Sequence, residues 1–290
     1  MLEPGFQHRF AVRDYDLAAT LGCGQAFRWC EIAGAWEGIV DGRWVKLRQT
    51  EADLILATTA TPQRDWGWLA EHLQTNADLA CVIATFPDDP PMRAAVKHCH
   101  GLRLLRQEPW ECLASFICSS TKQIVQIRQI IALLSERFGE SLIVPPGHAP
   151  AFAFPSPERL AAASESQLRA CKMGFRAPYL HETARTVASG ELHLVELHSR
   201  SCANARVKLE QLPGVGRKIA DCVLLFAYGF QEAFPVDVWV MKALRQLYFP
   251  RRRPTLQRLR GFSETHFGVN AGYAQQYLFH YMRTRDRGKK

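Results

Sequence analysis

The sequence predicts an α+β fold, with a strand-rich first third and a remainder that is almost entirely helical. Short runs rich in Trp, Val, Ile and Phe fill the first third, whereas apolar residues recur at intervals of three and four from Pro109 onward. The chain has 290 residues, too many for one compact core, so we expect about two domains. The change in pattern predicts a β-rich domain over residues 1–108 and a helical domain over residues 109–290.

The expected strands form an antiparallel meander. Gly34 and Asp41-Gly42 separate strand-like runs, and Asp-Gly between two such runs is a signal for a tight hairpin. The expected strands cover residues 25–31, 35–40, 43–49 and 53–58.

A helical region opens at Pro62, and the pattern is almost entirely helical from Pro109, a residue that suits the first turn of a helix. Ser156 and Ser164, each followed closely by a glutamate, indicate two further helix starts. The other expected helices cover residues 124–138, 176–189, 203–210, 217–228, 237–248, 255–266 and 271–282.

Composition narrows the class of protein. A content of 47% apolar and 22% charged residues argues against disorder, and an apolar run of about eight residues is too short to span a membrane, which needs about 20. Glu3, His8 and Arg9 lie where a secretory signal would be apolar, so we expect an intracellular protein. The nine scattered cysteines form no zinc-type pair, and none follows Cys222, which excludes a C-terminal four-cysteine iron–sulfur loop.

The formal net charge of +8 is concentrated in the second part of the chain. Residues 1–110 carry 11 basic and 14 acidic side chains, whereas residues 111–290 carry 25 and 14. A polyanion such as nucleic acid suits the basic part, and a solvated basic surface is the other interpretation. The basic runs 251–253 and 283–290 are expected in a loop and a tail, where they add loose attraction to phosphates.

The segment Leu209–Ala220 predicts two helices joined by a tight turn. Gly214 and Gly216 flank Val215 in this turn, and glycine permits positive φ angles and a close approach to a partner. The exposed N–H groups of these three residues, with Arg217 beside them at the start of the second helix, predict a site for a nucleic-acid phosphate. A purely structural helix–turn–helix is the alternative.

This turn leads to a family resemblance. The motif L-P-G-V-G-x-K-x-A, with Lys218 as its lysine and Asp237 in V-P-V-D about twenty residues later, resembles the helix–hairpin–helix GPD superfamily of DNA glycosylases. Residues 22–29, 116–120 and 274–279 make the chain similar to 8-oxoguanine DNA glycosylases over residues 8–282. The resemblance implies an N-terminal antiparallel sheet packed on a two-part helical body. A lysine at this place is typical of the glycosylase/lyase branch.

The resemblance also implies the catalytic residues. Lys218 is the amine that attacks the sugar of the damaged nucleotide, and it must be neutral to do so, a form that the positive end of the second helix favours. Asp237 stabilises positive charge on the sugar as the base leaves. Its position before a helix also suits an N-cap, and the two roles are compatible because a capped carboxylate is a fixed one.

Four further residues are implied in the pocket for the everted base. The Gly24 carbonyl accepts a hydrogen bond from N7–H of 8-oxoguanine, a proton that guanine lacks, and Gln275 reads the Watson–Crick edge. Cys222 and Phe279 sandwich the ring. Judged without the resemblance, Gly24 is a turn residue, and Cys222 and Phe279 are core residues.

Around the opposite base the sequence both follows the family and departs from it. Phe175 stands for the aromatic wedge and Arg176 for an arginine that donates to the estranged cytosine. The eukaryotic enzymes have asparagines where this chain has Thr121-Lys122-Gln123, and we expect Thr121 to lie at the DNA. Gln126 replaces their second cytosine-reading arginine. Trp239 replaces a histidine and alters the phosphate contact near the lesion. We therefore expect weaker discrimination for cytosine than in the eukaryotic enzymes.

The expected partner is double-stranded DNA that contains oxidised guanine, with no cofactor and no membrane. We expect a monomer in the bacterial cytoplasm or nucleoid. The hairpin carbonyls of Glu210, Leu212 and Val215 are expected to hold a structural cation, as family hairpins often do. Two other functions remain open: a monofunctional glycosylase for alkylated purines, and a non-catalytic helix–hairpin–helix protein that binds DNA.

Overall fold

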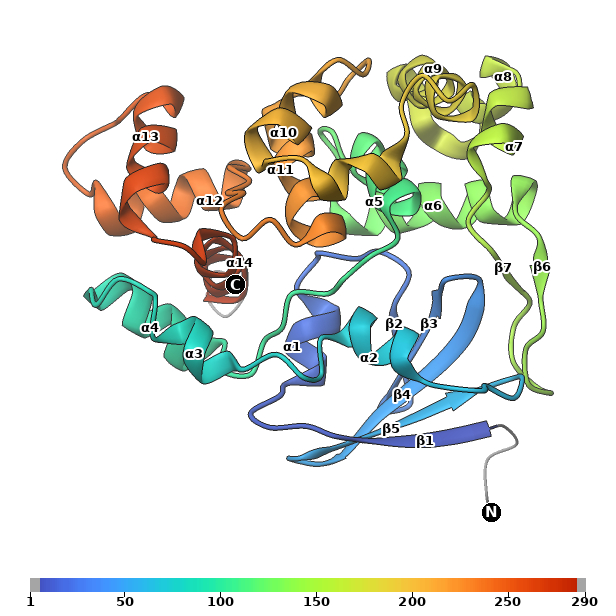
Figure 1. Ribbon diagram of the computed structural model, residues 1–290, viewed down its shortest axis with the longest axis horizontal. Coiled ribbons are helices and arrows are strands. Elements are labelled where there is room, and N and C mark those ends of the chain that lie inside the picture. The colour runs from blue at the N-terminus through green and yellow to red at the C-terminus, as the bar shows by residue number, and fades with distance from the viewer. Residues whose placement is uncertain (1–5, 286–290) are drawn as a thin grey trace.

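The computed structural model describes residues 6–285 and has an antiparallel sheet beside a larger body of helices, which confirms the α+β class (Figure 1). The sheet has five strands in the order β1-β5-β4-β3-β2. Val40 pairs with Arg43 across Asp41-Gly42, so the expected hairpin is present. The strands are β1 (Phe6–Ala11), β2 (Cys30–Ile32), β3 (Ala35–Val40), β4 (Arg43–Glu51) and β5 (Leu54–Thr59).

The expected strand over residues 25–31 is wrong for most of its length. Only Cys30–Ile32 pairs, with β3, because the segment before it is bonded elsewhere. The Gln25 carbonyl accepts at 2.8 Å from Nε2 of Gln107, which lies 82 residues later in the chain and belongs to no strand of the sheet. Two elements near the N-terminus were not expected: β1, which pairs with β5, and α1 (Leu17–Gly22), which is capped by the Asp16 carboxylate.

The helical region expected from Pro62 begins with α2, and α5 begins at Pro109 as expected. The Glu108 carboxylate caps α5 by accepting from the N–H groups of Trp110 and Glu111. A short hairpin of β6 (Ser141–Leu142) and β7 (Ala151–Phe152) interrupts the helices. The α-helices after α1 are α2 (Gly67–Leu73), α3 (Leu79–Ile83), α4 (Pro90–His98), α5 (Pro109–Cys118), α6 (Ile124–Phe138), α7 (Pro157–Ala162), α8 (Glu165–Leu168), α9 (Ala177–Ala188), α10 (Cys202–Glu210), α11 (Arg217–Val223), α12 (Val238–Ala243), α13 (Leu256–His266) and α14 (Ala271–Arg285). Single turns of other pitch are η1 (Arg169–Met173), η2 (Gly174–Arg176), η3 (Leu194–Ser199), η4 (Leu224–Tyr228) and η5 (Leu244–Tyr248).

The helices form two groups above the sheet, and α14 runs between them (Figure 1). The helices α3, α4, α12 and α13 lie on one side, whereas α5 to α11 lie on the other. α14 packs against α12 and α4, and α11 packs against α5. The helical body therefore has two parts, and α14 contacts an early helix of the chain as well as a late one.

Two hydrophobic cores hold the molecule together. The smaller core lies between the sheet, α1 and α2, and includes Leu21, Trp29, Leu47, Ile55 and Leu69. The larger core fills the helical body, and it also takes in residues from α3 and α4, such as Leu79 and Met92. Within residues 6–285, every helix is too short or too polar to cross a bilayer.

The carboxamide of Gln25 ties α1 and the turn after it to the segment that precedes α5. Its Nε2 donates to the carbonyls of Thr20 and Arg103 at 2.9 and 2.8 Å, and its Oε1 accepts from the Leu105 N–H at 2.8 Å. Gln25 is fully buried, so all three bonds are shielded from water. They fix the turn at Gly24 against the segment that leads into α5.

Replacing Gln25 with alanine is expected to lower the free energy of unfolding by roughly 2–4 kcal/mol, since it leaves a buried N–H group and two carbonyls unpaired. Urea denaturation followed by circular dichroism measures the change. The control is Gln129→Ala on the exposed side of α6, which is expected to shift stability by less than about 0.5 kcal/mol. Equal midpoints for the two variants would contradict the bridging role of Gln25.

Candidate active site

The predicted hairpin is present between α10 and α11. α10 ends at Glu210 and α11 begins at Arg217, each within two residues of the expected position. Gly214 has φ of +74°, and a Cβ atom there would lie 2.6 Å from the Tyr179 ring, so both backbone conformation and space require glycine. A buried ion pair between Arg206 and Asp221, with an N···O distance of 2.6 Å, fixes α10 to α11.

Arg217, which was expected to bind phosphate, lies between two carboxylates. Its Nη2 pairs with Glu264 at 2.5 Å, and its Nε lies 3.6 Å from Asp221. Burial raises the pKa of Asp221, which the charges of Arg206 and Arg217 oppose. A DNA phosphate at the hairpin therefore competes with Glu264 and Asp221 for this guanidinium.

The amino group of Lys218 lies against the end of α5. Its Nζ donates to the Ser119 hydroxyl at 3.1 Å and lies 5.4 Å from the centre of the Phe116 ring. Ser119 in turn donates to the Phe116 carbonyl at 2.7 Å, so the hydroxyl has a fixed orientation. Among residues 6–285, no carboxylate forms an ion pair with Lys218. The amine is thus held by a hydroxyl oxygen and a ring face at the end of α5.

Asp237 is the N-cap of α12, as its position in the sequence predicted. Its Oδ1 accepts from the N–H groups of Trp239 and Val240 at 2.9 and 2.8 Å. Burial raises the pKa of this carboxyl group, whereas the two N–H bonds and the charges of Lys218 and Arg283 oppose the rise. Asp237 and Lys218 therefore interact electrostatically, although one follows the hairpin and the other begins a later helix.

Cys222 lies one helical turn after Lys218 on α11 and is buried. Burial raises the pKa of its thiol to about 12, the positive charge of Lys218 lowers it, and the negative charge of Asp237 raises it. The thiol is therefore neutral and close to both proposed catalytic groups. This position suits an apolar wall of a base pocket.

The candidate base-binding residues of α14 share one face of that helix. Gln275, Phe279 and Arg283 follow one another at intervals of four residues, and all three are buried. Within the described part of the chain, the Oε1 atom of Gln275 is buried and has no hydrogen-bond partner. A buried acceptor without a partner costs free energy unless a ligand supplies a donor. The guanidinium of Arg283 lies 5.6 Å from the centre of the Phe279 ring.

Gly24 meets this face of α14 from the N-terminal part. It has φ of +86°, and a Cβ atom there would lie 2.6 Å both from Arg283 Nη1 and from Ile124 Cδ1. A side chain at this position is thus excluded by backbone conformation and by contacts on two sides. The structure brings Gly24, Phe279, Arg283 and Asp237 into one neighbourhood from three separate regions of the sequence.

Arg283 corrects an expectation and is a residue that the sequence reasoning missed. It was assigned to a basic tail over residues 283–290, but it is buried in the last turn of α14, with 8% of its surface exposed. Residues 286–290 of that run lie outside the described residues. Helical spacing from Gln275 and Phe279 is the signal that identifies Arg283 on the same face. Ser119, which binds Lys218, was noted only as part of a family motif.

The predicted opposite-base residues lie in η2, directly before α9, and Arg176 bonds to Ser120, the residue after the Ser119 that binds Lys218. Phe175 is exposed, with 53% of its surface accessible, and the buried Arg176 guanidinium lies 4.2 Å from its ring centre. Arg176 donates to Thr121 Oγ1 at 2.6 Å and to the carbonyls of Ser120 and Met173. Thr121 adopts a positive φ of 56°. In the free protein Arg176 therefore orders two loops around an exposed aromatic side chain.

The substitutions seen around these residues have structural roles of their own. Gln126 accepts from the Gln123 N–H at 3.1 Å and so caps the start of α6. Trp239 lies in the first turn of α12, half-buried, with the Lys242 Nζ at 5.3 Å from its ring centre. Of the hairpin carbonyls expected to hold a cation, that of Leu212 accepts from the Val215 N–H at 3.1 Å.

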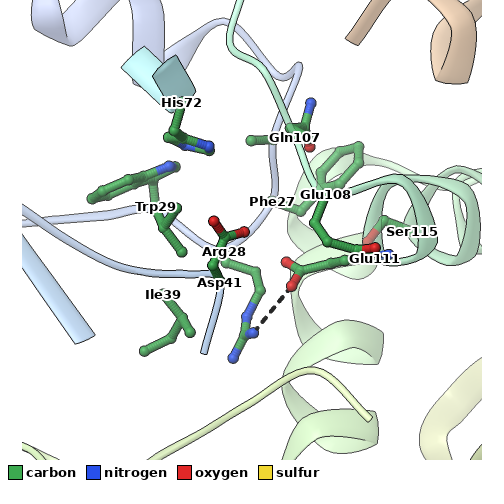
Figure 2. A pocket seen from close by; sticks show the side chains of 12 residues that line it. Phe27, Arg28, Trp29, Ile39, Asp41, His72, Gln107, Glu108, Glu111 and Ser115 are labelled. Carbon is green, nitrogen blue, oxygen red and sulfur yellow. Dashed lines mark hydrogen bonds and ion pairs between the residues drawn. The ribbon is translucent and has the colours of Figure 1, made fainter. Parts of the chain in front are cut away.

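A separate pocket lies where the sheet meets α5 (Figure 2). Arg28 and Glu111, which both line it, form an ion pair of 3.5 Å. Burial raises the pKa of Glu111 and lowers that of His72, which also lines the pocket, to about 4. Its lining includes neither Lys218 nor the base-binding residues of α14, so it is distinct from the candidate active site.

Known proteins match the chain over nearly its whole length. Residues 8–113 match the family model for the N-terminal domain of 8-oxoguanine DNA glycosylase, and residues 114–264 match that of the HhH-GPD superfamily of base excision DNA repair proteins. A probable N-glycosylase/DNA lyase of Methanothermobacter thermautotrophicus is 30% identical to this chain. The alignment has 312 positions and covers 95% of this chain and 96% of the relative.

Two solved structures are similar to this one. MBOgg1, in complex with a low-affinity DNA ligand, is 33% identical, with a TM-score of 0.91 and 98% of both chains covered. The Clostridium acetobutylicum 8-oxoguanine glycosylase/lyase, in complex with double-stranded DNA containing cytosine opposite 8-oxoguanine, is 30% identical, with a TM-score of 0.89 over 98% of this chain and 99% of that one. With its hairpin, its lysine and its capping aspartate, the chain belongs to the HhH-GPD superfamily of base excision DNA repair proteins and carries the N-terminal domain of the 8-oxoguanine DNA glycosylases.

Proposed function

We infer that the protein is a bifunctional DNA glycosylase that excises 8-oxoguanine from duplex DNA and then cleaves the abasic strand. The observation that carries this inference is the Lys218 amine, which is held by Ser119 without a carboxylate ion pair and lies within the electrostatic reach of Asp237. Relatives named as N-glycosylase/DNA lyase, and a similar structure named as an 8-oxoguanine glycosylase/lyase, support the same reaction.

In the proposed mechanism, the neutral Lys218 amine forms a bond to the anomeric carbon of the sugar, and the bond between that carbon and the base breaks. The base leaves with the bonding electron pair and takes up a proton. Ionised Asp237 stabilises the positive charge that develops on the sugar. The sugar ring then opens to a Schiff base on Lys218, and loss of a proton from the sugar expels the 3′ phosphate and cleaves the strand.

The proposed base pocket is lined by Gly24, Cys222, Gln275 and Phe279. The damaged base leaves the helical stack to enter it, because its glycosidic bond is out of reach within the duplex. The buried Gln275 Oε1 atom supports this role, since it has no partner among residues 6–285 and the base edge offers N–H donors. The Gly24 turn supports recognition of N7–H by a backbone carbonyl.

We also propose that Phe175 fills the space beside the opposite base and that Arg176 donates to the estranged cytosine. The exposure of Phe175 and its packing on the Arg176 guanidinium support a pre-formed wedge. Backbone N–H groups of Gly214 to Gly216, with Arg217, are proposed to bind a DNA phosphate, and Thr121 and Trp239 to contact DNA. We further propose that a domain boundary follows residue 108 and that the carbonyls of Glu210, Leu212 and Val215 hold a cation. We also propose that the protein acts as a monomer in the bacterial cytoplasm or nucleoid.

Replacing Lys218 with glutamine is expected to abolish the covalent adduct that borohydride traps on a duplex containing 8-oxoguanine, because no other amine occupies the nucleophile position. Affinity for the duplex is expected to fall by less than about tenfold, since one charge contributes about one released counterion. The matched control is Lys208→Gln on the exposed side of α10, which is expected to trap as the wild type does.

The same experiment separates the alternatives. A monofunctional glycosylase for alkylated purines gives no adduct with the wild type and excises 3-methyladenine, and a DNA-binding module gives neither product. If the Lys218→Gln variant still nicked the lesion strand, the nucleophile would be a different residue.

Asp237→Asn separates the charge of this residue from its cap. The asparagine Oδ1 still accepts from Trp239 and Val240, so α12 stays capped, whereas charge stabilisation is lost. Single-turnover excision is expected to slow by roughly 10²–10³-fold. The control Asp53→Asn, at an exposed position, is expected to leave the rate unchanged. A slowdown no larger than that of the control would exclude an electrostatic role for Asp237.

The wild-type rate is also expected to depend on pH through Asp237. Burial raises the pKa of this carboxyl group, and the reaction needs its ionised form. Excision therefore falls as pH drops through a value above the ordinary aspartate pKa of about 3.9. A rate profile from pH 4 to 8 measures this limb, which is expected to vanish in Asp237→Asn. A limb that persists in the variant belongs to another group.

Discrimination for cytosine is expected to be modest, because Gln126 caps α6 in place of a second arginine. Excision opposite C is expected to exceed excision opposite T, G or A by roughly tenfold or less, and Gln126→Arg is expected to widen that ratio, since one bidentate base contact is worth about 1–3 kcal/mol. Parallel single-turnover rates on the four duplexes give the comparison. A preference for cytosine well above 100-fold in the wild type would refute this expectation.

A further inference from the structure

Arg283 makes contacts that reach the turn before the proposed base-reading glycine. Its Nη2 donates to the Gly22 carbonyl at 2.7 Å, and its Nη1 donates to the Cys23 carbonyl at 3.0 Å. The two carbonyls are adjacent in the chain, and the planar guanidinium fork spans both at once. Gln276 Nε2 adds a longer bond of 3.4 Å to the Cys23 carbonyl. The turn is therefore tied to α14 by two side chains that lie seven residues, or about two helical turns, apart.

The same guanidinium lies directly against Gly24. The position of a Cβ atom on Gly24 is 2.6 Å from Arg283 Nη1, so the arginine occupies the space beside the glycine backbone. Arg283 also shares the face of α14 that carries Gln275 and Phe279, and it lies close enough to Phe279 for a cation–π contact. One side chain thus touches the turn, borders the glycine and packs on the proposed base-stacking ring.

The opposite flank of the turn is fixed by Gln25, whose buried carboxamide bonds to Thr20, Arg103 and Leu105. Without Arg283 the turn would be held on that flank and by the weaker Gln276 bond. Burying a cation costs free energy, and here two main-chain oxygens offset part of that cost by accepting from the two Nη groups. The contacts therefore give Arg283 a defined task in holding the turn to α14.

We propose that Arg283 is a positioning residue for base recognition, which locks the Cys23–Gly24 turn to α14 so that the Gly24 carbonyl meets the damaged base at the face formed by Gln275 and Phe279. This inference rests on the proposed function. In this proposal the forked guanidinium of Arg283 holds the turn in place, and its effect is on the step at which the base is recognised. The later chemistry at the sugar does not need this turn.

An abasic duplex isolates the step in which Arg283 acts, because it has no base for Gly24 to read. We compare single-turnover excision of 8-oxoguanine with borohydride trapping on the same duplex carrying a preformed abasic site. Arg283→Met is expected to slow excision by roughly 100-fold, the cost of misplacing a recognition group by about 1 Å, and to change abasic-site trapping by less than about threefold. Arg285→Met, at an exposed position on α14, is the matched control and is expected to match the wild type on both substrates.

Arg283→Lys separates geometry from charge. Lysine keeps the positive charge near Asp237 but loses the planar fork, so excision is expected to slow by roughly tenfold, again with trapping preserved. Excision at the wild-type rate in Arg283→Lys would overturn the inference, because charge alone would then suffice. Equal losses on both substrates, or no loss on either, in Arg283→Met would overturn it as well.

If Arg283→Met is not folded, as shown by the loss of a cooperative unfolding transition, the two substrates are compared with Arg283→Lys instead. A wild-type protein that is trapped at abasic sites but does not excise 8-oxoguanine would overturn the proposed substrate and this inference together. If the wild-type protein excises 8-oxoguanine, and the Arg283 variants lose as much activity on the abasic duplex as on the 8-oxoguanine duplex, only this inference is overturned.

Discussion

The rest of the site depends on how Lys218 is held. Its amine rests on a hydroxyl and a ring face at the end of α5, and the carboxylate that it senses, Asp237, is occupied in capping α12. A direct ion pair would hold the ammonium form and block attack on a sugar carbon. The fold thus keeps the acid near enough to stabilise positive charge, while its cap bonds keep it in place. Two helix termini hold these groups. Asp237 is fixed by N–H groups at the start of α12, and Ser119, which binds Lys218, lies at the end of α5.

Helix α14 connects this chemistry to the recognition of the base. One of its faces carries a buried acceptor that has no partner within residues 6–285, an aromatic ring and an arginine that reaches the N-terminal part of the chain. α14 also packs against α12, which Asp237 begins, and against α4. Movement of α14 would therefore shift the base pocket and the carboxylate together. In the proposed mechanism, α14 therefore connects the base pocket to the helix that Asp237 caps.

Regular patterns in the sequence were sufficient for the helices from Pro109 onward and for the hairpin. Pro109, the glycine turn and Asp237 each act through bonds within a few residues, so local sequence predicts them. The strand expected over residues 25–31 was wrong, because the partners of Gln25 lie about 80 residues away and no local pattern reveals them. Arg283 was assigned to a tail for the same reason. Its bonds to Gly22 and Cys23 span about 260 residues of sequence.

The α+β class and the basic character of the helical part follow from periodicity and composition, and the family resemblance singled out Lys218 and Asp237 as the proposed catalytic residues. The groups that surround these two residues are fixed by the tertiary structure. It paired Arg217 with Glu264, placed Ser119 under Lys218, and left the Gln275 oxygen buried without a partner among residues 6–285. The physical reason is that hydrogen bonds, ion pairs and burial depend on distances in space, which sequence separation does not encode.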